Sequence, residues 1–167
     1  KYILSGEDIP DSRLELAFND GSMKVYRNKA FLPRSFFLTD YRVISEKEEA
    51  LAFMKSEEFC PEDIVVLNEE PVGLEKKSDN IHGKAIVDIK EYQPGKVILN
   101  VAVPSNGILV LSDLFYPGWE AFVDGEEVKI LRADYILRAI YMPEGKHLVK
   151  FEYNPKPFNS GVKLSLC

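Results

Sequence analysis

The stretch from Leu114 to Tyr153 most constrains what this chain can fold into. It reads LFYPGWEAFVDGEEVKILRADYILRAIYMPEGKHLVKFEY, a series of short apolar runs separated by turn signals, without helical periodicity. Asp124-Gly125 stands between two of these runs, and an Asp-Gly pair tolerates the positive φ angles of a two-residue hairpin turn. Gly145 marks a further turn. The stretch therefore predicts a meander of short antiparallel strands.

The residues just before this stretch continue the pattern. Apolar residues alternate with polar ones over 85–89 and again over 97–103, with Pro94-Gly95 as the turn between them. The run ILVLSD (108–113) is apolar at both parities, which is typical of a central strand with neighbours on both faces. Strands separated by turn signals every 8 to 12 residues or so indicate an antiparallel β-sandwich or jelly roll over residues 81–167.

The first part of the chain adds strands and one helix. LELAF (14–18) and MKVYRN (23–28) flank the hairpin signal Asn19-Asp20-Gly21, and residues 34–44 read as one buried strand. Ser45 and Glu48 form a capping box, and the apolar spacing that follows predicts an amphipathic helix over 45–59.

The fold class predicted is therefore mainly β, with one helix in an N-terminal α+β portion. We expect residues 1–80 to form this portion and residues 81–167 to form the sandwich, either as separate parts or combined in one domain. The polar segment 68–80, marked by Pro and Gly, is the expected boundary.

Charge and motif content exclude several functions. The net charge of −6 and pI near 5.1, without a basic patch, argue against nucleic acid as a partner. His82 and His147 stand in no metal-ligand spacing, and the chain has neither a phosphate-binding Gly-rich loop nor a nucleophile elbow. We expect no metal, no cofactor and no catalytic residue. Cys60 and Cys167 are expected to be free thiols, since nothing in the sequence pairs them.

The ends of the chain suggest a piece of a longer protein. No run approaches the roughly 18 apolar residues that cross a bilayer, and the start lacks the pattern of a signal peptide. Yet the chain opens abruptly on KYIL and closes on GVKLSLC, which resembles the approach to a membrane helix.

The aromatic cluster around Trp119 is the candidate binding site. Sugar rings bind with their C–H faces on aromatic planes while polar side chains take the hydroxyl groups, so Tyr116 and Trp119 beside Asp113, Asp124 and Asp134 could form such a platform. The residues expected to bind a substrate are Tyr116, Trp119, Asp134 and Arg138. A structural interpretation stands beside this one. Trp119 is in phase with apolar residues of its strand and is expected in the core, and Arg138 is expected to form an ion pair with Asp134 or Glu120.

The motifs of this stretch also carry a family resemblance. Tyr116-Pro117-Gly118-Trp119, Asp124-Gly125, Ala133-Asp134-Tyr135, Arg138-Ala139 and the turn from Pro143 to His147 follow one another here as they do in the YfhO-type bacterial multi-spanning membrane proteins. The segment VYRNKAFLPRSFF (25–37) is similar to a second motif of that family. The chain thus resembles the C-terminal extracytoplasmic portion of these proteins.

The resemblance implies a membrane glycosyltransferase of the GT-C class that uses a lipid-linked sugar in the glycosylation of cell-wall polymers such as lipoteichoic acid. Its catalytic acid would lie in a loop that this sequence does not contain. The implied location is the extracytoplasmic face of the membrane. The implied partners are the transmembrane helices of the parent protein and a glycan or polyprenyl-phosphate-sugar.

Three functional hypotheses remain open at this point. The chain is a non-catalytic domain that positions a glycan acceptor or sugar donor, or a structural or protein-interaction domain without a ligand, or an independent glycoside hydrolase. The first predicts an exposed aromatic and acidic groove around Tyr116 and Asp134. The second predicts buried aromatics and an exposed apolar patch elsewhere. The third predicts two carboxylates about 5 to 9.5 Å apart in a cleft.

Overall fold

The computed structural model describes residues 1–73 and 84–155, and the chain divides into two compact units, Lys1–Pro33 and Arg34–Cys167. We call them the N-terminal unit and the main unit. Among the described residues, no helix is long and apolar enough to cross a membrane.

The N-terminal unit is a three-stranded antiparallel sheet in the order β1-β3-β2. Its strands are β1 (Tyr2–Ser5), β2 (Leu14–Asn19) and β3 (Lys24–Asn28). The predicted hairpin at Asn19-Asp20-Gly21 joins β2 and β3: Gly21 has a φ of 92°, and the Asp20 amide donates to the Met23 carbonyl over 3.2 Å. This turn therefore spans four residues between the strands.

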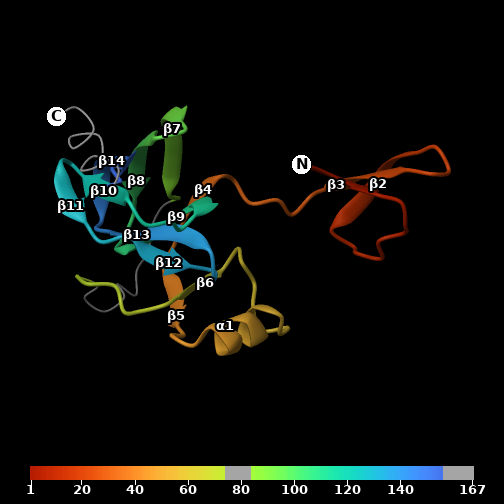
Figure 1. Cartoon of the computed structure of the whole chain (residues 1–167), viewed down its shortest axis with the longest axis horizontal. Helices are drawn as coiled ribbons and strands as arrows, with labels where there is room; N and C mark the ends of the chain where they lie inside the picture. Colours follow the sequence, from red (N-terminus) through yellow and green to blue (C-terminus); the bar gives the residue numbers. More distant parts are fainter. Residues whose placement is uncertain (74–83, 156–167) are drawn as a thin grey trace, which may run out of the picture. The chain divides into compact units, whose positions relative to one another are not determined.

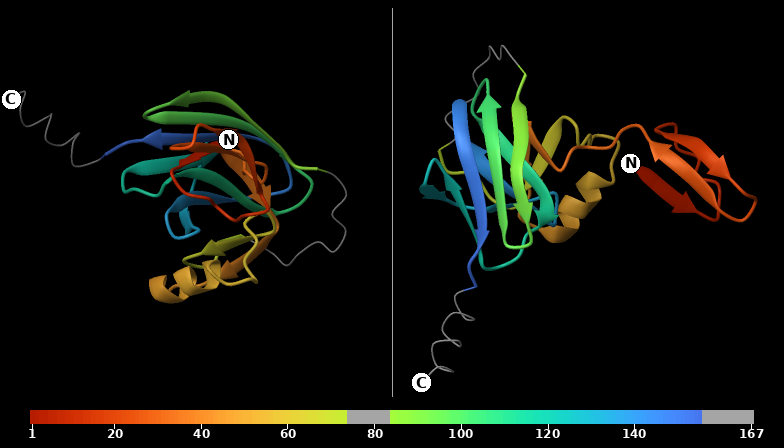
Figure 2. Two further views of the ribbon diagram at one scale, coloured as in Figure 1. Left: turned by 90° about the vertical axis from the view of Figure 1, so that its right-hand side faces the viewer. Right: turned by 90° about the horizontal axis from the view of Figure 1, so that it is seen from above.

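The main unit contains a five-stranded and a six-stranded sheet (Figure 1). The five-stranded sheet is antiparallel and has the order β11-β10-β14-β8-β7, with bounds Glu126–Val128, Trp119–Val123, Gly145–Tyr153, Lys96–Val103 and Ile86–Gln93. In Figure 2, β7, β8 and β14 run side by side, drawn in green and blue.

The six-stranded sheet has the order β4-β9-β13-β12-β6-β5. Its bounds in that order are Ser35–Leu38, Gly107–Leu114, Leu137–Met142, Leu131–Ala133, Ile64–Leu67 and Asp40–Val43. All its pairs are antiparallel except β5 with β6. As predicted, β9 is a central strand and its first five residues are buried.

One apolar cluster lies between the two sheets of the main unit. It takes alternate residues from β8, β10 and β14 of the first sheet and from β9 and β13 of the second: Val97, Leu99, Val101, Val103, Leu109, Leu111, Ala121, Val123, Ile140, Met142, Val149 and Phe151. Because each strand contributes residues at a spacing of two, one face of each sheet points inward. The fold is mainly β, as the sequence predicts, with two sheets packed face to face that are antiparallel except for the pair β5–β6.

Two apolar runs that read as single strands are each divided in the structure. Residues 34–44 form β4 and β5, which lie at opposite edges of the six-stranded sheet although only Thr39 separates them. Since so short a connection spans about 7 Å, the sheet must curl until its edges approach each other. The run EEVKIL forms β11 and β12, in different sheets. Alternation predicts a strand but not the sheet that it joins.

The helix is shorter than the predicted segment 45–59. Helix α1 spans Lys47–Met54, and Glu46 occupies the N-cap position without a side-chain hydrogen bond. The capping box predicted for Ser45 is therefore wrong. The helix ends early because the chain turns after it, where the Ser56 hydroxyl and amide both bond the Phe53 carbonyl. Ala50 of the helix packs against Ile44 and against Val66 of β6.

The compact units differ from the predicted portions 1–80 and 81–167. Strands β4, β5 and β6 come from the first predicted portion but pair within the sheet that holds β9, β12 and β13. The boundary expected at residue 80, like His82 and Cys167, lies outside the described residues. Cys60 is a free thiol, as predicted, and it is exposed.

Candidate ligand-binding pocket

A pocket of about 450 Å³ lies where β10, β13 and β14 meet the ends of β7 and β9. Its lining includes four aromatic side chains and two charged ones: Tyr92, Tyr116, Trp119, Tyr153, Asp113 and Arg138. We call it the Trp119 pocket. All these residues belong to the main unit.

The turn before β10 presents two of the aromatic side chains. Gly118 has a φ of 97°, a conformation that favours glycine, and a Cβ at this position would lie 3.0 Å from the Tyr153 ring. Trp119 follows in the inward phase of β10, opposite Tyr153 on β14, and their ring centroids are 5.5 Å apart. Trp119 packs against the core cluster and also lines the pocket. Tyr116 is 61% exposed.

Arg138 occupies a position that the sandwich otherwise fills with apolar side chains. Along β13 it is in phase with Ile140 and Met142, which belong to the core cluster, and it is only 2% exposed. Its guanidinium carbon lies 3.8 Å from the centroid of Trp119 and 5.7 Å from that of Phe151. The guanidinium thus stacks on one face of Trp119, a cation–π contact that fixes both groups.

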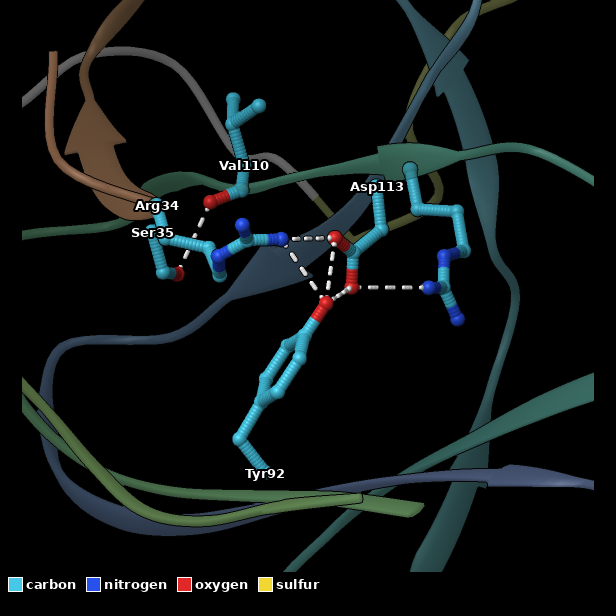
Figure 3. Close-up of polar contacts among 6 residues, drawn as sticks. Arg34, Ser35, Tyr92, Val110 and Asp113 are labelled. Atoms are coloured by element: carbon cyan, nitrogen blue, oxygen red, sulfur yellow. Dashed lines mark hydrogen bonds and ion pairs between the residues drawn. The ribbon is translucent and has the colours of Figure 1, made fainter. Parts of the chain in front are cut away.

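Asp113 is the centre of the polar contacts in the pocket (Figure 3). Its carboxylate accepts from Arg34 Nη1 over 2.7 Å and from Arg138 Nη2 over 3.1 Å. The Tyr92 hydroxyl lies 2.9 and 3.1 Å from the two carboxylate oxygens, and Arg34 Nη1 also bonds this hydroxyl over 2.8 Å. One carboxylate therefore joins two guanidinium groups and a phenol.

Burial shifts the pKa values of two of these groups, Tyr92 and Arg138. It raises the pKa of the Tyr92 phenol, an effect that the hydrogen bond to Asp113 reinforces. It lowers the pKa of the Arg138 guanidinium, which the charge of Asp113 opposes. Arginine nevertheless remains charged at physiological pH. Its Nε and Nη1 atoms are buried, and neither has a hydrogen-bond partner among the residues that the structure describes.

Of the four residues predicted for the binding site, three come together in the Trp119 pocket: Tyr116, Trp119 and Arg138. Arg138 pairs with Asp113 instead of Asp134 or Glu120. Tyr92 and Arg34 give no sequence signal, because they reach Asp113 only through the pairing of strands distant in the sequence.

Asp134 lies elsewhere, in the turn between β12 and β13. It is 9% exposed and has a φ of 43°; its Oδ1 accepts from the Val66 amide over 2.9 Å, while its own amide donates to the Val66 carbonyl. Burial raises its pKa to about 6, against the lowering effect of the Val66 amide. Asp134 therefore joins the turn to β6 and does not line the Trp119 pocket.

Another hollow of about 450 Å³ lies on the opposite face of the five-stranded sheet, lined by residues such as Ile86, Asn100, Lys146 and Leu148. Its lining contains no Trp, Tyr or Phe among the described residues. Nor does that part of the chain contain a group of three His, Cys, Asp or Glu residues that could hold a metal ion. The Trp119 pocket is the better candidate because it combines aromatic planes with buried charge.

Fold and pocket together define a β-sandwich domain with an aromatic-lined, charged pocket at one end. A family model described as "Bacterial membrane protein YfhO" matches residues 8–165. The chain therefore belongs to the YfhO family of bacterial membrane proteins, as the sequence motifs indicated. No curated protein and no solved structure matches it.

Proposed function

We propose that the main unit is a non-catalytic, extracytoplasmic glycan-binding domain of a membrane glycosyltransferase-like protein. It would position a glycan acceptor or a lipid-linked sugar donor during the glycosylation of a cell-wall polymer of the lipoteichoic acid type. Membership of a bacterial membrane protein family supports the membrane context. The transmembrane helices of the parent protein would be its partners.

The observation that carries this proposal is the composition of the Trp119 pocket. Exposed Tyr116 and partly buried Trp119 offer the aromatic surfaces that sugar rings use, and the pocket volume of about 450 Å³ lies within the usual range for small-ligand sites. Asp113, Tyr92 and Arg138 place hydrogen-bonding groups beside these surfaces. Asp113 is the single carboxylate among the described lining residues, and it is held by two cations, which favours binding over glycosidase chemistry.

The test uses the fluorescence of Trp119, the single tryptophan of the chain. Titration of the 167-residue chain with purified lipoteichoic acid and with a panel of cell-wall oligosaccharides should change this fluorescence and saturate. Tyr116→Ala should weaken binding about 10-fold or more, since an aromatic stacking surface is lost. Tyr2→Ala is the matched control, because Tyr2 is 64% exposed and lies in the N-terminal unit. Equal loss in both variants, or no binding by the wild type, would contradict the proposal.

One observation favours a second candidate, a structural or interaction role for the N-terminal unit. Its sheet exposes large apolar side chains, among them Tyr2, Leu4 and Phe18, and Leu4 and Phe18 lie in one cross-strand row through Val25. Such patches mark interaction surfaces. Replacing Leu4 and Phe18 with Ser in the parent protein should then reduce its assembly in the membrane while ligand titration of the isolated chain stays unchanged.

A further inference from the structure

We propose that the ligand of the Trp119 pocket carries an anionic group, a carboxylate or a phosphate, and that this group binds the guanidinium of Arg138. The inference rests on the proposed glycan-binding function and adds the charge of the ligand to it. It follows from the position of Arg138, from its unused hydrogen-bond donors and from the charge balance around it.

The position of Arg138 is not explained by packing. Its neighbours in the same phase of β13 are Ile140 and Met142, and the opposing sheet presents Phe151 and Trp119. An apolar side chain would fill such a site without loss of hydration, and replacing a buried ion pair with apolar residues is often neutral or stabilising. A cation at this position therefore calls for a role other than stability.

The donors of Arg138 are only partly used. Nη2 bonds Asp113, whereas Nε and Nη1 are buried without a partner in the described part of the chain. Buried donors normally have partners, and each exception needs an explanation. Arg138 is one of the residues that line the pocket, so an anion bound there would lie beside this guanidinium. A carboxylate or phosphate suits it, because both groups offer several oxygens to its planar set of N–H donors.

The charge balance also favours an anion. Among the residues that the structure describes, Asp113 is the one negative group in the polar contacts of the pocket, and it faces two positive groups, Arg34 and Arg138. The set therefore carries one uncompensated positive charge. Asp113 forms hydrogen bonds with three partners, Arg34, Tyr92 and Arg138. Because its single negative charge is shared between two guanidinium groups, Arg138 still attracts a second anion. A neutral sugar could accept hydrogen bonds from Arg138 but would not neutralise this positive charge.

The experiment compares four probes by Trp119 fluorescence at low salt: glucose, glucuronate, glucose 1-phosphate and inorganic phosphate. At least one of the two acidic sugars should bind about 10-fold or more tighter than glucose, and about 0.5 M NaCl should reduce this preference because salt screens the charge. A preference for glucuronate identifies a carboxylate and one for glucose 1-phosphate a phosphate. Inorganic phosphate binding as well as glucose 1-phosphate would show that the sugar ring contributes nothing.

Equal binding of glucose and both acids would overturn the inference while leaving the glycan-binding proposal intact. Failure of all four probes and of the cell-wall glycans would overturn both. The two failures are therefore distinguishable.

Variants locate the effect at Arg138. Arg138→Gln should abolish the preference for the acidic sugar over glucose, whereas Arg138→Lys should keep part of the preference because it keeps the charge. Lys55→Gln, an equal change of charge at an exposed position after α1, should have no effect. An unchanged preference in Arg138→Gln would refute the assignment. If that variant does not fold, the wild-type comparison of acidic and neutral probes decides alone.

Discussion

Asp113 and Asp134 are two largely buried carboxyl groups at ends of strands in the same sheet, yet their surroundings differ. Asp113 is the second-last residue of β9 and lies among Arg34, Arg138 and the Tyr92 hydroxyl. The carboxyl of Asp134 has one neutral donor, the Val66 amide, and burial raises its pKa to about 6. A buried carboxyl with cationic partners becomes part of a polar site, whereas one without them favours its protonated form.

The largest effect is expected from Asp113→Ala. This change removes the one carboxylate that pairs with the buried guanidinium of Arg138 among the described residues, and breaking such a pair costs about 3 to 5 kcal/mol. Urea denaturation should show this loss in the free energy of unfolding. Asp88→Ala removes an exposed carboxylate that pairs with Lys90, so it should change stability by less than about 0.5 kcal/mol. A loss of under about 1 kcal/mol for Asp113→Ala would mean that Arg138 has other support.

Asp134→Asn should act in the opposite direction and depend on pH. The folded state raises the pKa of Asp134 from 3.8 to about 6, so it binds the proton more tightly than the unfolded chain does. The wild type therefore loses stability as pH rises from about 4 to 6, by about 3 kcal/mol at most. Asparagine still accepts from the Val66 amide and tolerates the positive φ.

Thermal unfolding at pH 4 and pH 8 measures this difference. Asp134→Asn should raise the melting temperature at pH 8 and have little effect at pH 4. Asp113→Asn, the same change at the other carboxyl, should lower the melting temperature at pH 8. If the two variants changed the melting temperature in the same direction at pH 8, the two carboxyl groups would not differ in the way described above.

A smaller effect is expected from Tyr92→Phe. The change removes the hydroxyl that lies within 3.1 Å of both oxygens of Asp113, and a hydrogen bond of this kind contributes about 1 kcal/mol. Urea denaturation should resolve this loss. Tyr116→Phe removes the hydroxyl of an exposed ring and should leave stability unchanged. Equal values for both variants would show that the Tyr92 hydroxyl does not support Asp113.

Arg34→Gln should have the smallest effect, about 0.5 kcal/mol, because the Arg34 side chain is half exposed and its pair with Asp113 is screened by solvent. The loss should shrink in about 0.5 M NaCl, whereas that of Asp113→Ala should persist. A loss as large as that of Asp113→Ala would mean that the Arg34–Asp113 pair stabilises the fold as much as the Arg138–Asp113 pair does.

Local chemistry made much of the fold predictable. Asp124-Gly125 has φ values of 52° and 92° and forms the expected turn between β10 and β11. Alternation correctly indicates the inward residues of β8, and apolar residues at both parities indicate central β9. These features depend on residues close together in the sequence, so pattern alone reveals them.

The pocket was predictable only in part. Tyr116, Trp119 and Arg138 lie within one motif-rich stretch, and the sequence marked all three. The Arg34 contacts with Tyr92 and Asp113 span 58 and 79 residues, and they depend on how strands pair. Asp134 illustrates the same limit, since its turn carries it to Val66 in β6 instead of to the pocket.

The position of β14 has a consequence for how the chain folds as it is synthesised. This strand lies between β10 and β8, so each of these two strands lacks one of its two neighbours until residues 145–153 have been made. Likewise β4 pairs with β9, and β6 with β12, across long separations in the sequence. The hairpins β7–β8 and β10–β11 can form earlier, but the five-stranded sheet joins them only after β14 has been made. Such non-local pairing makes folding slow.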